Sequence, residues 1–252
     1  GLLAGLPSLL ERAAGLPELY GMRLALGLFC ALYLASMALY SRLPARVATE
    51  RPGGLADLTP ESRPIVAKIS ALFLIDALAG GFIGTAIFAY FFAKAFGAGP
   101  GEIALLFAAG RTLSAFSHFA AAWLASRIGL VNTMVYTHIP SSLLLFTVAS
   151  ADSFGWAAFF FLAREALNEM DVPTRQSYVM AVVKPHERLA AAGITNLVRS
   201  GGWAVAPGFA GWLMQGAGLA APLVVAAVGK IAYDLLLWRE FRRVKPPEER
   251  SP

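Results

Sequence analysis

A cluster of ionisable side chains interrupts the long apolar stretch 154–183. Arg164, Asn168, Asp171 and Arg175 are spaced so that they share one face of a helix. A helix of a soluble protein would turn such a face to water and would not need the solid apolar flank that precedes it. Inside a bilayer, ionisable groups are costly and face a bundle interior or a water-filled pathway. The spacing therefore marks this helix as a candidate functional element of a membrane protein.

Asp171 and Arg175 are also four residues apart, a spacing at which opposite charges on a helix can pair. Two interpretations are open. The charges can take part in moving a solute, or, with Glu165 and Glu169, they can lock helices together at a cytoplasmic gate. Pro173 removes a backbone hydrogen bond beside these charges, so we expect the helix to bend there.

Two further charges are expected at depth in other apolar stretches. Asp76 lies about 12 Å into its span at 1.5 Å per residue, and glycines follow it that permit close helix packing. A buried carboxylate there could load and release a proton. The alternative is a structural ion pair with a neighbouring arginine such as Arg111. Arg111 itself lies near mid-depth and could hold an anionic substrate.

His138 lies in the middle of its span, two residues before Pro140. It is a candidate proton relay, because histidine titrates near neutral pH, or a hydrogen-bonded packing residue. Arg199 lies near other polar side chains and is a candidate for the wall of a cavity. Lys230 and Asp234 form a further i,i+4 pair, which we interpret as structural.

The composition indicates a membrane protein. Apolar residues make up 57% of the chain and charged residues 15%, against roughly 25% charged residues in globular domains. The net charge of +5 does not indicate nucleic acid, because the basic residues form no patch with interleaved aromatics. The single cysteine excludes an internal disulfide and a cysteine-based metal site. We expect no metal and no cofactor, and no phosphate-binding Gly-Lys loop supports ATP-driven chemistry.

Seven apolar stretches are long enough to cross a bilayer as helices. They are 22–41, 67–93, 102–126, 131–150, 154–183, 188–214 and 217–239. The segment 42–66 is polar and rich in Pro, Gly and Arg, so we interpret it as a linker between two bundles. The chain starts with Gly, and we expect it to be part of a longer protein.

Lys and Arg are distributed unevenly between the two sets of span ends. Thirteen lie in 42–68, 126–132, 184–188 and 239–252, and three lie in 1–23, 94–101, 151–153 and 216–218. Because cytoplasmic loops carry the excess of positive charge, the linker and the C-terminal tail are predicted to be cytoplasmic. The five remaining Lys and Arg residues lie inside the spans.

Three motifs carry a resemblance to a known family. Arg164 and Pro173 are followed by the loop KPHER at 184–188, and a glycine-rich motif, G-x3-A-P-x2-A-G, includes Gly202, Pro207 and Gly211. The loop 122–129, AWLASRIG, is similar to a cytoplasmic gate motif in which Ser126 replaces the usual Asp. In this order, the motifs resemble the C-terminal half of a major facilitator superfamily secondary transporter.

The resemblance implies an all-α polytopic membrane protein, built as a six-helix bundle plus one helix of the preceding half. Residues 1–41 would end the N-terminal half, 42–66 would be the cytoplasmic linker, 67–239 the bundle and 240–252 a cytoplasmic tail. The implied location is the plasma (inner) membrane. The implied partners are a small-molecule substrate, protons, the lipid bilayer and the missing N-terminal half, with no nucleic acid.

The function implied is proton-coupled export of a small organic solute by alternating access, that is, antiport rather than an enzymatic reaction. The alternatives are a membrane-embedded lipid-processing enzyme and a non-transporting membrane subunit. Pro173, Gly202, Pro207 and Gly211 are expected to bend and pack helices. The candidates for transport or coupling are Asp171, Arg175, Arg164, Glu169, Asp76, Arg111, His138 and Arg199.

Overall fold

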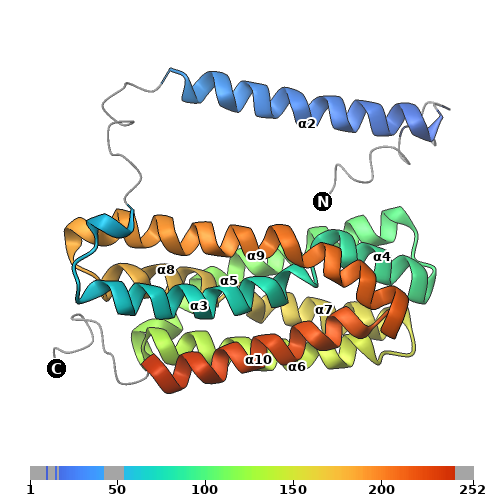
Figure 1. Ribbon diagram of the computed structural model, residues 1–252. Coiled ribbons are helices and arrows are strands. Elements are labelled where there is room, and N and C mark those ends of the chain that lie inside the picture. Colours follow the sequence, from blue (N-terminus) through green and yellow to red (C-terminus); the bar gives the residue numbers. More distant parts are fainter. Residues whose placement is uncertain (1–9, 11–14, 16, 43–53, 242–252) are drawn as a thin grey trace.

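The computed structural model describes residues 10, 15, 17–42 and 54–241, and every regular element in these residues is a helix (Figure 1). This confirms the all-α fold class. The principal helices are α2 (Glu18–Tyr40), α3 (Ser62–Gly81), α4 (Thr85–Phe96), α5 (Pro100–Ile128), α6 (Leu130–Ala149), α7 (Phe154–Asn168), α8 (Asp171–Ala181), α9 (Arg188–Ala217) and α10 (Ala221–Phe241). Two short 3-10 helices, η3 (Leu55–Asp57) and η4 (Pro185–Glu187), precede α3 and α9.

Helices α3 to α10 form one bundle, in which the chain runs from one end to the other six times. Helix α3 begins and α10 ends at the same end of this bundle, as an even number of passes requires (Figure 1). The most extensive contacts join α9 to α3, α10 to α6 and α3, and α7 to α6 and α5. By contrast, the large apolar side chains of α2, such as Leu26, Leu34 and Leu39, are exposed.

Two of the six passes are broken, and neither break was predicted from the apolar pattern. The expected span 67–93 consists of α3 and α4, separated at 82–84 beside Gly84. The expected continuous helix 154–183 is α7 followed by α8, so our expectation of a single helix with a bend was wrong. Pro173 is the third residue of α8, where a backbone N–H has no partner inside the helix. Proline is therefore accommodated in the first turn after the break.

Composition and length alone identify four membrane-crossing candidates among the described residues: Leu19–Tyr40, Ser62–Phe96, Pro100–Ile128 and Ala221–Phe241. The predicted spans in α6, α7–α8 and α9 are also helical, but α7 and α8 are each too short to cross a membrane alone, and all three spans carry polar side chains. Their polar side chains include buried ones, such as His138 and Arg164, which turn to the bundle interior instead of lipid. The bundle begins at Ser62, before the expected boundary at 67, and the tail 242–252 and the linker residues 43–53 lie outside the described residues.

A glycine-mediated contact brings α3 and α9 together. A Cβ atom on Gly81 would lie 2.5 Å from Cβ of Ala206, and one on Gly202 would lie 2.8 Å from Cβ of Ala77. No real Cβ atom tolerates such approaches, so the two backbones pack closely because glycine occupies these positions. Helix α9 is thus held against the part of α3 that carries Asp76.

Two apolar clusters fill the two ends of the bundle. One includes Ile69, Met134 and Tyr178, and the other includes Phe92, Leu145 and Phe161. In α3, α6 and the α7–α8 pair, buried polar or charged residues lie between the two clusters, among them Asp76, His138 and Asp171. The bundle therefore carries a buried charged layer between two apolar ends.

The start of the bundle is tied to the loop before α9 through Glu187, which is fully buried. Its carboxylate accepts hydrogen bonds from the Ser62 hydroxyl at 2.6 Å, from the backbone N–H of Lys184 at 3.1 Å and from the backbone N–H of Thr59. The Ser62 hydroxyl is the main contact that holds the pKa of Glu187 at about 2, below its usual 4.5. A charged carboxylate thus joins two segments far apart in the sequence.

Candidate functional site

The charged layer contains a continuous chain of contacts across four helices. Asp171 of α8 pairs with Nη2 of Arg175 at 2.5 Å, and Nη1 of Arg175 donates to Oδ2 of Asp76 in α3 at 2.9 Å. The other oxygen of Asp76 accepts from Nζ of Lys230 in α10 at 3.0 Å. All four side chains are buried. Asp76 therefore joins two cations from two other helices.

The chain continues from Lys230 into a histidine–aspartate pair. Nζ of Lys230 lies 3.1 Å from Nε2 of His138 in α6, and Nδ1 of His138 lies 2.9 Å from Oδ1 of Asp234. The ring of Tyr233 contacts the imidazole edge to face, with 6.0 Å between centroids, and its hydroxyl has no hydrogen-bond partner among the described residues. His138 and Asp234 are fully enclosed.

These contacts define where protons lie. An ammonium group only donates, so Nε2 of His138 accepts from Lys230, and Nδ1 carries the proton that it donates to Asp234. In this arrangement the contact chain holds three carboxylates and the two basic side chains of Arg175 and Lys230. An unbalanced charge is costly in a buried layer, and one proton added to the His138–Asp234 pair would balance it. This pair is therefore a candidate site for binding and releasing a proton.

A second polar group lies on α7 and the neighbouring α5. The Arg164 guanidinium donates to the adjacent Glu165 carboxylate and, through Nη2, to Oδ1 of Asn168 at 2.9 Å. Glu169 pairs with Arg111 across 3.8 Å. The Arg111 side chain is 64% exposed, so this long pair is the one most easily exchanged for another partner.

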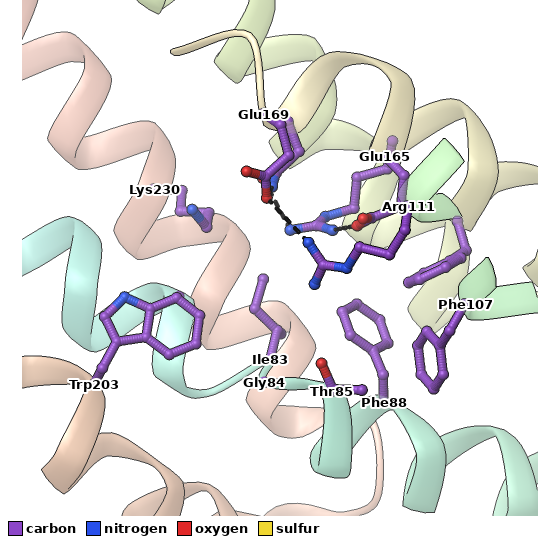
Figure 2. A pocket seen from close by; sticks show the side chains of 14 residues that line it. Ile83, Gly84, Thr85, Phe88, Phe107, Arg111, Glu165, Glu169, Trp203 and Lys230 are labelled. Carbon is purple, nitrogen blue, oxygen red and sulfur yellow. Dashed lines mark hydrogen bonds and ion pairs between the residues drawn. The ribbon is translucent and has the colours of Figure 1, made fainter. Parts of the chain in front are cut away.

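A cavity of about 140 Å³, here called cavity A, opens beside this second group. Figure 2 shows Arg111 and Glu169 facing each other at its wall, with Trp203 and Lys230 on the opposite side and the ring of Phe88 below Arg111. Gly110 makes room for the Glu165 side chain, because a Cβ atom there would lie 3.1 Å from Cγ of Glu165. The walls are formed by Gly80, Ile83, Gly84, Thr85, Phe88, Phe107, Arg111, Phe161, Arg164, Glu165, Asn168, Glu169, Trp203 and Lys230.

Two more cavities follow cavity A, and the first of them, cavity B, adjoins it. Cavity B, about 160 Å³, is lined by Asp76, His138, Asn168, Glu169, Asp171, Val172, Arg175, Arg199, Trp203 and Lys230. Cavity C, about 250 Å³, is lined by Phe73, Arg175, Gln176, Val179, Met180, Ala192, Thr195, Asn196 and Arg199. Cavities A and B share Asn168, Glu169, Trp203 and Lys230, and cavities B and C share Arg175 and Arg199. The three cavities thus form a row along the bundle.

The row gathers the predicted site residues. Each of the eight candidates for transport or coupling lines at least one of the three cavities. The five Lys and Arg residues inside the predicted spans also line the row, namely Arg111, Arg164, Arg175, Arg199 and Lys230. The row is therefore where the membrane-embedded cations of the described residues meet.

Several expected pairings are corrected by the structure. Asp76 does not pair with Arg111, which contacts Glu169 instead. Lys230 and Asp234 do not pair along their helix, because Lys230 turns to Asp76 and Asp234 turns to His138. The break between α7 and α8 divides the expected polar stripe into two separate pairs, Arg164–Asn168 and Asp171–Arg175.

The residues expected to bend and pack helices differ in whether their surroundings require them. Gly202 lies in the close contact with α3, and Pro207 is accommodated inside α9. A Cβ atom on Gly211 would meet nothing within 4 Å, so no packing within the described residues requires glycine there.

Sequence reasoning left Lys230, Asp234 and Glu165 out of the site. The sequence did contain a signal for Lys230 and Asp234, because a charged i,i+4 pair in the last apolar stretch is costly unless it faces the interior of the bundle. No group of three or more His, Cys, Asp or Glu side chains in the described residues could hold a metal ion.

Comparisons with known proteins concern the family of the chain. The family model of the Major Facilitator Superfamily matches residues 69–252. The chain is 25% identical over 181 residues to an uncharacterized membrane protein of Saccharomyces cerevisiae. That alignment covers 71% of this chain and 40% of the yeast protein, so the chain spans well under two thirds of this relative. No solved structure matches the chain.

Proposed function

We propose a transport function for this chain, starting from the premise that it belongs to the Major Facilitator Superfamily. The chain acts as the C-terminal half of a secondary transporter that moves a small organic solute by alternating access. Transport is coupled to protons, and export is the direction that the resemblance of the sequence motifs implies. The protein spans the plasma (inner) membrane with a cytoplasmic C-terminus. As a member of a transporter family, it is not an enzyme.

The observation that supports this proposal best is the row of cavities in contact with the buried histidine–aspartate pair. Ionisable residues inside a membrane face interiors and mark solute or ion pathways. Here they converge from α3, α5, α7, α8, α9 and α10 on one row. In secondary transporters, solute sites lie near the midplane at the interface of two repeats, often at broken helices. Both broken passes of this bundle contribute to the row.

Lys230 links the proton site to the cavities in this proposal. It contacts Nε2 of His138 and also lines cavities A and B. When His138 binds a proton at Nε2, that nitrogen can no longer accept a hydrogen bond, and two cations would face each other. The ammonium of Lys230 then leaves His138 and keeps Asp76 as its partner. Proton binding in this way changes the charge presented to a solute in the cavities.

Transport by the full-length protein in proteoliposomes tests the proposal. A panel of small organic solutes is supplied with and without an imposed proton gradient. We expect at least one solute to accumulate with the gradient, and a protonophore to abolish that accumulation. A protein that carries out no gradient-dependent flux with any member of a chemically broad panel contradicts the proposal.

A further inference from the structure

We propose that cavity C binds the carboxylate of a small organic monoanion with an apolar body, and that Arg199 is the residue that holds it. This inference names the solute class for the proposed function and rests on that function. It follows from the charge of the cavity, from its other walls and from its position in the row.

Arg199 is the one cation of the row without a direct partner among the described residues. Arg111, Arg164, Arg175 and Lys230 each form an ion pair within 4.0 Å, whereas Arg199 forms none. Its Nε atom is buried and has no hydrogen-bond partner, as in Arg164 and Arg175, but those two arginines form ion pairs through their Nη atoms and Arg199 does not. A buried donor without a partner is costly, so the site is incomplete without an acceptor.

The walls of cavity C indicate what that acceptor is. No carboxylate lies among the described residues that line it, so an anion entering the cavity meets no repulsion at its walls. Arg175, which also lines cavity C, is already neutralised by Asp76 and Asp171. Arg199 therefore remains the one cation of cavity C without an ion pair within 4.0 Å among the described residues, and a single guanidinium matches a single negative charge better than a phosphate dianion. The planar guanidinium of arginine suits the two oxygens of a carboxylate.

The rest of the cavity favours an apolar body with few polar groups. Phe73, Val179, Met180 and Ala192 supply apolar surface, and Gln176, Thr195 and Asn196 supply hydrogen-bonding groups. Its volume of about 250 Å³ is close to the lower limit of small-molecule sites, which begin at roughly 300 Å³. A small aromatic or short aliphatic acid fits these walls, with its carboxylate directed to Arg199.

Matched carboxylates and amides test the charge requirement directly. Benzoate and hexanoate are compared with benzamide and hexanamide, which have nearly the same shape but no charge. Binding to the full-length protein in nanodiscs is measured as ligand-dependent stabilisation in thermal melts at millimolar concentrations. We expect the acids to stabilise the protein and the amides to do so at least about tenfold more weakly, because a charge-assisted hydrogen bond is lost.

Variants test the assignment to Arg199. Arg199→Gln is expected to weaken acid binding about tenfold or more, and Arg199→Lys to weaken it less, because the charge remains while the planar fork is lost. Lys68→Gln is the matched control, since Lys68 is an exposed cation paired with Glu240 outside the cavities, and it should bind the acids normally. If Arg199→Gln does not fold, the comparison of acids with amides on the unaltered protein still decides the charge requirement.

Three outcomes overturn the inference: equal binding of acids and amides, unchanged acid binding in Arg199→Gln, or no stabilisation by either acid. The experiments distinguish a failure of this inference from a failure of the proposed function. Gradient-driven flux of an uncharged solute without acid binding would keep the function and remove this site. Binding of acids that depends on Arg199, without any flux, would keep the site and remove the transport function.

Discussion

Nζ of Lys230 lies 3.1 Å from Nε2 of His138, a contact that exists only while this nitrogen carries no proton. The two residues come from different helices, and Lys230 at the same time holds Asp76 in a third helix. Protonation of one imidazole nitrogen thus changes an interaction that spans α3, α6 and α10. This relationship is why we place proton coupling at His138 and Asp234.

Variants of the Asp171–Arg175 pair can distinguish a structural role of these charges from a role in transport. Arg175→Gln leaves the carboxylates of Asp76 and Asp171 without their shared cation, so we expect low membrane abundance. Asp171→Asn is milder, because Arg175 keeps Asp76. The double variant Asp171→Asn/Arg175→Gln should recover abundance relative to Arg175→Gln but transport poorly, as measured by flux normalised to protein in the membrane. Normal flux at normal abundance would reduce the pair to scaffolding.

The close contact of α3 with α9 predicts opposite results for two neighbouring glycines. A side chain at Gly202 meets Cβ of Ala77 at 2.8 Å, so Gly202→Leu should destabilise the protein by about 1–3 kcal/mol. Gly201 has nothing within 4 Å of its Cβ position, so Gly201→Leu should be neutral or slightly stabilising, because leucine favours a helix. Thermal melts of the purified variants measure both. Equal melting temperatures would refute the close contact.

The buried carboxylate of Glu187, which lies outside the membrane-spanning part, predicts that the stability of the protein depends on pH. Its folded pKa of about 2 lies below the usual 4.5, so its contribution is present above pH 4.5 and is lost as pH falls through about 2. Glu187→Gln should therefore melt below the unaltered protein at pH 7, and the difference should shrink progressively below pH 4.5. Glu61→Gln is the control, since the exposed Glu61–Lys184 pair is expected to contribute little. A difference independent of pH would argue against a charged Glu187.

The distribution of Lys and Arg predicts which loops face the cytoplasm. In a Cys30→Ala background, which removes the exposed native thiol, single cysteines are placed at Gly54, Gly99 and Ser251. We expect an impermeant thiol reagent to label Gly99→Cys in intact cells and to spare the other two. Labelling of Gly54→Cys from outside would reverse the predicted orientation.

Much of the architecture could be predicted from the sequence. Apolar stretches of sufficient length predicted the helices, and the motifs predicted the family, which the family model confirms. The breaks at 82–84 and 169–170 were not predicted. At 82–84 the apolar run continues across the break, and at 169–170 the spacing of the charged residues also fits one continuous helix. Break positions depend on local packing, such as that around Gly84 and Trp203.

The partners within the charged layer were predicted less well, for a physical reason. Helical spacing describes neighbours on one helix, and it suggested that Lys230 pairs with Asp234. The contacts observed join residues 154 positions apart in Lys230–Asp76 and 96 apart in His138–Asp234. In a buried layer each charge takes the partner that best offsets its lost hydration, and packing between helices decides which partner that is.

Proton coupling at the histidine–aspartate pair is tested most directly with Asp234→Asn, which keeps the shape and an acceptor for His138 but removes the negative charge that favours a proton on Nε2 of His138. Proteoliposomes containing the full-length protein are loaded with a transported solute, and gradient-driven flux is compared with solute exchange at equal pH. Asp152→Asn, an exposed loop residue, is the control. We predict that Asp234→Asn loses gradient-driven flux while exchange persists and the control behaves normally. Unchanged gradient-driven flux in Asp234→Asn, at normal abundance, would contradict the account.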